Sequence, residues 1–102
     1  MNYKVVFASP RIGKEFGRAL EAIPQKSVRD EIMYKVEELA ENPKPFPPNP
    51  KLQGAIPIFG QLAQYRIKVG RYRIFYDVND RTLTVYVIAL RIRDDKTYGR
   101  SR

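Results

Sequence analysis

A run of prolines divides this chain into two halves with different hydrophobic periods. Residues 42–50 read Asn-Pro-Lys-Pro-Phe-Pro-Pro-Asn-Pro and hold five of the eight prolines. Proline lacks an amide hydrogen and has a fixed φ, so neither a helix interior nor a central strand can continue through this segment. We interpret it as a stiff extended connection between a helical half and a sheet half. Pro45 and Pro48 also match the PxxP spacing of peptide ligands, which is the alternative interpretation.

The first half predicts one strand and two helices. Residues 2–8 are rich in Val, Phe and Tyr and predict a short strand. A helix over residues 10–23 is predicted from a capping serine, a proline at the first helical position and an apolar stripe: Ser9, Pro10, Ile12, Phe16, Leu20 and Ile23. A second helix over residues 25–41 has its own stripe: Val28, Ile32, Val36, Leu39 and Ala40. The short break at Pro24 predicts that the two helices form an antiparallel hairpin.

The second half alternates with the period of a strand. Residues 62–69 and 71–78 each place apolar side chains on one face and mostly polar ones on the other, and Gly70 between them permits a tight turn. Residues 82–90 are apolar on both faces, which is typical of a central strand. The chain is therefore predicted to be α+β. It is expected to be a small single domain over residues 1–102, with an N-terminal strand and a two-helix antiparallel hairpin packed on a mainly antiparallel sheet of about four strands.

Positive charge gathers on one face of that sheet. Residues 1–50 carry a net charge of +1 and residues 51–102 carry +7, out of a total of +8. Arg66, Lys68, Arg71 and Arg73 share one face by alternation, with Phe75 beside them. Like charges on adjacent strands repel one another unless a counter-charge is present, so this face predicts a polyanionic partner, with nucleic acid the first candidate. An ordinary solvated face is the alternative.

Composition excludes several kinds of chemistry. The chain has no cysteine and no histidine, so thiol nucleophiles, disulfides and Ser–His or Cys–His pairs are impossible, and a transition-metal hydrolase is disfavoured. No apolar run approaches the roughly 18–20 residues that span a bilayer, and no signal peptide is evident at the start. We therefore expect a cytoplasmic protein without a membrane partner, ending in a flexible basic tail over about residues 94–102.

One motif resembles a known family. Lys51-Leu52-x-Gly54 is followed by Tyr-Arg-Ile-Lys-Val-Gly-Arg-Tyr-Arg-Ile-Phe-Tyr over residues 65–76, then by a strand ending in Arg-Ile-Arg at 91–93 and by Tyr98. This order resembles the RelE/ParE toxin superfamily over nearly the whole chain. The RelE branch, which the resemblance favours, implies the toxin of a toxin–antitoxin pair. Such a toxin is a ribosome-dependent endoribonuclease (an mRNA interferase), in which the RNA 2′-hydroxyl attacks the adjacent phosphate without a metal or other cofactor.

The resemblance also implies residue roles. Arg66 and Lys68 match the basic pair of the first motif strand, with Lys68 the candidate for proton transfer. Arg73 matches the arginine that holds the scissile phosphate, and Arg93 the one that assists the leaving 5′-oxygen. Tyr98 matches the tyrosine that stacks on or orients a base, although its spacing from Arg93 differs from several family patterns; Tyr65 or Tyr72 is the fallback. Six further residues are expected to bind RNA: Lys51, Arg71, Phe75, Arg91, Lys96 and Arg100.

Two alternatives from other functional classes remain open. The ParE branch has the same fold but inhibits DNA gyrase and lacks the ribonuclease residues; a non-catalytic RNA-binding module is the third possibility. Each toxin branch implies a cognate antitoxin, expected to be an acidic or amphipathic peptide that covers apolar grooves and neutralises the basic face in a hetero-oligomer. The ribonuclease hypothesis adds the ribosome and mRNA as partners.

Overall fold

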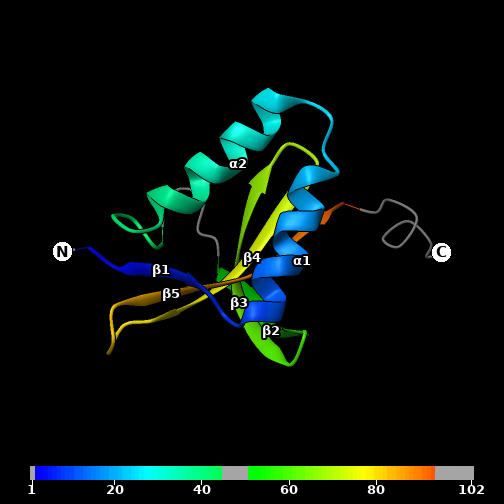
Figure 1. Cartoon of the computed structure of the whole chain (residues 1–102). Helices are drawn as coiled ribbons and strands as arrows, with labels where there is room; N and C mark the ends of the chain where they lie inside the picture. The colour runs from blue at the N-terminus through cyan, green and yellow to red at the C-terminus, as the bar shows by residue number, and fades with distance from the viewer. Residues whose placement is uncertain (1, 45–50, 94–102) are drawn as a thin grey trace.

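The computed structural model describes residues 2–44 and 51–93. A short strand leads into two helices, and four further strands follow (Figure 1). In chain order the elements are β1 (Lys4–Phe7), α1 (Pro10–Glu21), α2 (Lys26–Glu38), β2 (Lys51–Ile58), β3 (Gln61–Val69), β4 (Tyr72–Asn79) and β5 (Thr84–Ile92). The predicted α+β class is confirmed, and both predicted helices form, each ending two or three residues earlier than expected.

The strands form one five-stranded sheet in the order β1-β5-β4-β3-β2. Only β1 and β5 run parallel; the other neighbours are antiparallel, as predicted. The fifth strand, β2, is the one that the alternation did not predict. It contains Gly54 and Pro57 and pairs with β3 alone, and an edge strand is where a sheet tolerates proline.

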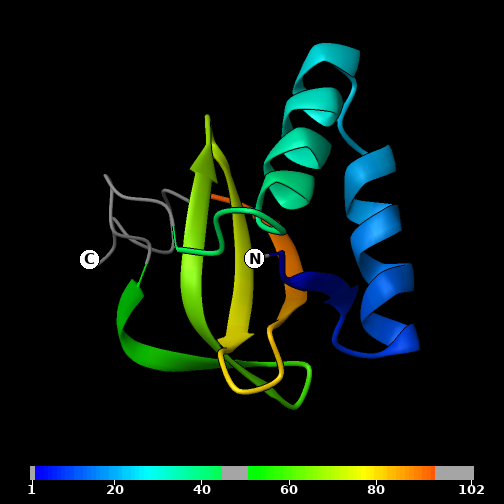
Figure 2. The same cartoon turned by 90° about the vertical axis from the view of Figure 1, so that its left-hand side faces the viewer.

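Both helices cover the same side of the sheet (Figure 2). The main core lies between them and the strands, where Phe16 of α1 and Ile32 of α2 pack with Ile74 and Val87. Fully buried aliphatic side chains of this kind each stabilise the fold by roughly 1.5–3 kcal/mol. The opposite sheet face is largely left uncovered by the helices (Figure 2), and that leaves most of it available for function.

Local interactions explain where the helices begin and end. The Ser9 hydroxyl accepts a hydrogen bond from the Ile12 amide at 3.1 Å, and Pro10 occupies the first turn of α1, as expected for a capped start. The Arg29 guanidinium donates to the carbonyls of Ile23 and Pro24, which satisfies acceptors left open where α1 ends. The tight connection between the helices is thus held by a side chain from α2.

A polar cluster joins the β4–β5 turn to two other segments of the chain. Tyr3 and Lys44 both donate to the carboxylate of Asp80, at 2.7 and 2.6 Å. The hydrogen bond from Lys44, followed by that from Tyr3, lowers the pKa of Asp80, while the same carboxylate raises the pKa of both donors. The hydroxyl of Tyr76 donates to the Pro43 carbonyl at 2.9 Å, and burial raises its pKa. The chain entering the proline-rich segment is therefore fixed to the sheet.

Across residues 2–44 and 51–93, no helix is long and apolar enough to cross a membrane.

Candidate nucleic-acid interface

The predicted basic residues converge on one hollow of the uncovered sheet face. Among the residues that the structure describes, four cations line a hollow of about 370 Å³: Arg66, Lys68, Arg73 and Arg93. Strand pairing explains the grouping. Lys68 of β3 lies opposite Arg73 of β4, which in turn lies opposite Arg91 of β5, so the three residues form one row across the sheet. Arg66 is two residues before Lys68 on the same face.

The turn between β3 and β4 holds the side chain of Arg73 and the backbone of Arg93. One guanidinium nitrogen of Arg73 donates to the carbonyls of Gly70 and Tyr72, at 2.8 and 2.9 Å. The Arg93 amide donates to the Arg71 carbonyl at 2.6 Å, which holds the chain beyond β5 against the same turn. Gly70 has a φ of +58°, a conformation that glycine adopts without strain, so the residue suits this turn. Arg73 is consequently fixed before any anion arrives.

Three of the four cations in the hollow have no carboxylate partner among the described residues. Within the described part of the chain, no carboxylate lies within ion-pair distance of Arg66, Lys68 or Arg73. Asp77 is on the same face, but its carboxylate accepts a hydrogen bond from Gln64 at 3.2 Å, farther along the strands. Four cations around one hollow suit a phosphate group, because forked guanidinium donors match its oxygens.

One predicted RNA-binding residue is wrong. Phe75 faces the same side as Arg66, yet it is only 7% exposed and packs in a second core cluster with Ile12 and Ile58. The β2–β3 hairpin contributes Ile58 and Ala63 to this cluster, so the hairpin takes part in burying Phe75. Phe75 is therefore a core residue and offers no ring to a base.

The remaining predicted residues divide into several groups. Arg71 is exposed in the β3–β4 turn, and Arg91 lies with its guanidinium 5.8 Å from the ring centre of Phe59. Tyr65 and Tyr72, the fallback stacking residues, belong to the core, as Tyr65 stacks on Tyr76 with ring centres 5.4 Å apart and Tyr72 packs beside the main cluster. Four predictions lie outside the described residues or side chains and stay predictions: the side chain of Lys51, and Lys96, Tyr98 and Arg100.

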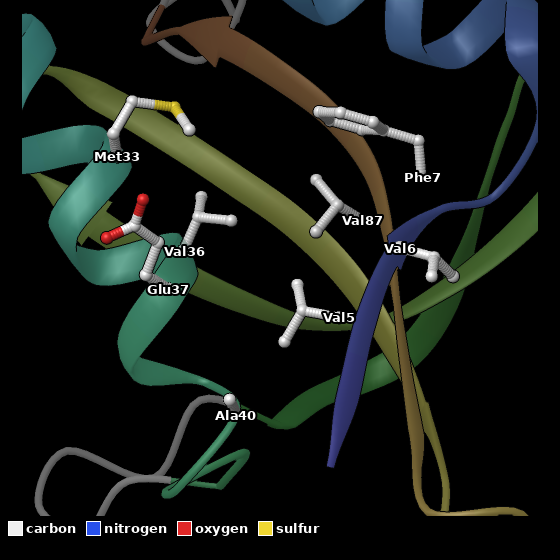
Figure 3. Close-up of a pocket in the computed structure, with 8 residues that line it drawn as sticks. All are labelled: Val5, Val6, Phe7, Met33, Val36, Glu37, Ala40 and Val87. Atoms are coloured by element: carbon white, nitrogen blue, oxygen red, sulfur yellow. The ribbon is translucent and has the colours of Figure 1, made fainter.

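A second surface feature had no signal in the sequence. An apolar groove of about 420 Å³ runs between the edge strand β1 and the C-terminal half of α2. Figure 3 shows Met33 and Val36 of α2 facing Val5 and Val87 across it. Among the described residues, Glu37 is the only charged one that lines it. None of these residues stands out in the sequence by itself, because the groove forms only where α2 and β1 come together in the fold.

Comparisons with known proteins agree with the fold. Residues 10–96 match the family model described as the ParE toxin of the type II toxin–antitoxin system parDE. Among solved structures, an arginine-to-alanine mutant of the Escherichia coli toxin RelE, in complex with an antitoxin RelBc peptide, is similar at 26% identity with a TM-score of 0.65, over 100% of this chain and 96% of that one. Isolated E. coli RelE is similar at 24% identity and a TM-score of 0.64, over 97% and 94%.

An archaeal relative has the same architecture. The RelE–RelB complex of Pyrococcus horikoshii OT3 is similar at 22% identity and a TM-score of 0.63, over 98% of this chain and 99% of that one. A comparison with curated protein sequences found no match. The fold and these similarities define a small toxin of a toxin–antitoxin pair. Within that class, the chain belongs to the RelE/ParE superfamily.

Proposed function

We propose that this toxin is a ribosome-dependent mRNA endoribonuclease that acts in the cytoplasm. The observation that carries the proposal is the hollow lined by Arg66, Lys68, Arg73 and Arg93, where no described carboxylate pairs with the first three. A phosphodiester in this hollow gains charge as a 2′-oxygen attacks it. Donors that are already oriented stabilise that charge without reorganising, which is the largest single contribution in many enzymes.

Each side chain has a role in this mechanism. Lys68, as the neutral amine, accepts the proton of the RNA 2′-hydroxyl, whose oxygen attacks the adjacent phosphorus. Arg66 and Arg73 hold the phosphate oxygens while the bond from phosphorus to the 5′-oxygen breaks. Arg93 donates a hydrogen bond to that leaving oxygen, which takes up a proton from water. The products are a 2′,3′-cyclic phosphate and a 5′-hydroxyl, so the step needs neither a metal nor a protein nucleophile.

A primer-extension assay on a translated message tests the proposal. Wild-type protein should cut the message, and Arg73→Ala should lower cleavage by about 100-fold or more, the usual loss when one donor to a developing oxyanion is removed. Arg81→Ala is the matched control, since Arg81 is an exposed arginine in the β4–β5 turn, away from the hollow. Equal cleavage by wild type and Arg73→Ala would exclude this site.

Inhibition of DNA gyrase is the second candidate function. The observation in its favour is that the matching family model describes a ParE toxin. In that case the basic hollow is dispensable, and Arg73→Ala remains as toxic as wild type. A supercoiling assay with purified gyrase separates the two functions, because a ribonuclease leaves supercoiling unchanged.

The cognate antitoxin is the expected protein partner. Several solved relatives are recorded in complex with RelB antitoxins. We propose that the antitoxin of this chain places apolar side chains in the groove between β1 and α2. It should also bring acidic residues to the basic hollow, which would block phosphate binding.

A further inference from the structure

The turn between β2 and β3 holds an aromatic residue in an unusual backbone conformation. Ile58 pairs with Gln61, so Phe59 and Gly60 alone form the turn, with φ values of +50° and +78°. A two-residue hairpin of this kind favours Asn-Gly or Gly-Gly, because a bulky side chain is strained at positive φ. A phenylalanine at position 59 is therefore strained by the positive φ that this turn requires. Strained residues of this sort concentrate at functional sites.

Two arginines flank the ring. The guanidinium of Arg11 lies 5.2 Å from the ring centre of Phe59 and that of Arg91 lies 5.8 Å from it, both within the range of a cation–π interaction. Phe59 is nevertheless 38% exposed, so these contacts do not enclose the residue. Glu15 also lines the small hollow beside the ring, where its carboxylate lies 3.7 Å from Arg18.

The ring is continuous with the basic hollow. Arg91, which contacts Phe59, lies directly opposite Arg73 in the register of β4 and β5. Neighbouring strands are about 4.8 Å apart, so a row runs from Lys68 through Arg73 and Arg91 to the ring within the length of a few nucleotides. An aromatic ring beside a track of cations is the arrangement that single-stranded RNA-binding surfaces use.

We propose that Phe59 is a base-stacking site for single-stranded RNA, with Arg11 and Arg91 binding the phosphates on either side of the stacked base. The inference rests on the proposed function, since it assigns a second contact to the same RNA. Phe59 is also an exposed aromatic ring beside the hollow, a role for which the sequence had suggested Phe75. Stacking tolerates any base. The site therefore contributes to the affinity for RNA and to its position on the protein more than to sequence preference.

A purely structural role is the competing explanation, in which the ring only joins the hairpin to α1 and β5. Phe59→Asn separates the two, because asparagine suits positive φ and relieves the backbone strain while it removes the ring. Leu83→Asn is the matched control. Within residues 2–44 and 51–93, Leu83 is the other non-glycine residue with positive φ, +52°. It lies in the β4–β5 turn, at the opposite end of β4 and β5 from Arg73 and Arg91.

The experiment uses a single-stranded RNA whose riboses are 2′-O-methylated, so that it binds without being cut. Because the chain has no tryptophan, Phe59→Trp introduces a single indole that can be excited apart from the tyrosines, and Tyr34→Trp places one on the exposed face of α2 as a control. We expect saturable quenching of the Phe59→Trp emission only. Phe59→Asn should weaken binding, measured by anisotropy, roughly 5- to 150-fold, with an unchanged circular dichroism spectrum. Leu83→Asn should bind as wild type does.

Three results would overturn the inference, and they are distinguishable. If wild type binds the RNA but Phe59→Trp emission does not change and Phe59→Asn binds equally well, the stacking site is wrong and the proposed function stands. If wild type does not bind the RNA at all, the stacking site is again wrong, and the primer-extension assay on translated message decides the proposed function separately. Loss of antitoxin binding by Phe59→Asn, with RNA binding intact, would assign the ring to a protein contact and would equally contradict the inference.

Discussion

At the scale of single residues, Arg73 carries most of the functional argument. Its guanidinium is held by two backbone carbonyls of the turn that precedes it, and its remaining donors are available to an anion. An arginine fixed in this way loses little side-chain entropy when it binds phosphate. The hydrogen bonds that orient Arg73 are therefore part of the site, although they contact no substrate.

The contribution of Asp80 to the stability of the fold should depend on pH. Its pKa is lowered in the folded protein from an ordinary value of 3.8, so its contribution to stability is present above that value and is lost as pH falls through the lower folded pKa. Asp80→Asn should therefore lower Tm modestly at pH 7, and the difference from wild type should disappear well below pH 3.8. Thermal melts across this range measure it, with the exposed Glu21→Gln as control. Equal Tm values at pH 7 would show that the cluster with Tyr3 and Lys44 is not stabilising.

Phe75 shows that residue alternation predicts the face on which a side chain lies but not whether that side chain is buried. The period of two placed Arg66, Lys68, Arg73 and Phe75 on one face, and the strand register confirms that placement. Whether a side chain on that face is open or covered depends on what crosses over it. Here Ile12 and Ile58, from α1 and β2, bury Phe75 and leave the cations exposed or partly exposed. These contacts join segments that are distant in the sequence, so no local sequence pattern predicts them.

At the scale of elements, β1 and α2 together form the groove assigned to the antitoxin. Met33 lines this groove and is only partly buried, so a charge there can be introduced near the surface. Met33→Lys should weaken antitoxin binding about tenfold or more, because it places a cation in an apolar contact. Calorimetry with the purified antitoxin measures the loss, and Tyr34→Ala, on the exposed face of the same helix, should bind normally. Unchanged affinity for Met33→Lys would move the antitoxin to another surface.

The elements themselves were largely predictable, and the exceptions have physical causes. Both helices, β1, and strands β3 to β5 follow from periodicity, caps and turn residues. Strand β2 was not predicted, because Gly54 and Pro57 break the alternation by which a strand is recognised. The groove and the environment of Phe59 also went unpredicted, since each depends on the spacing between elements rather than on the residues of one element.

At the scale of the whole molecule, the positive charge sets how RNA binding responds to salt. The chain carries a net charge of +8, and each cation that contacts a phosphate of a single strand releases counterions on binding. The logarithm of RNA affinity should fall linearly with the logarithm of salt concentration, and Arg66→Ala should reduce the slope by about 0.7. Anisotropy titrations at several salt concentrations measure it. A slope that Arg66→Ala leaves unchanged, as expected for Arg81→Ala, would show that Arg66 contacts no phosphate.

The central claim is that the RNA supplies its own nucleophile in the basic hollow. The most direct measurement is cleavage of a ribosome-bound message that carries a single 2′-deoxynucleotide on the 5′ side of the cut. The mechanism predicts that this one missing oxygen abolishes cleavage at that position, while cuts elsewhere in the same message continue. Cleavage that persists at the deoxy position would contradict the mechanism, because a different nucleophile would then have to attack the phosphate.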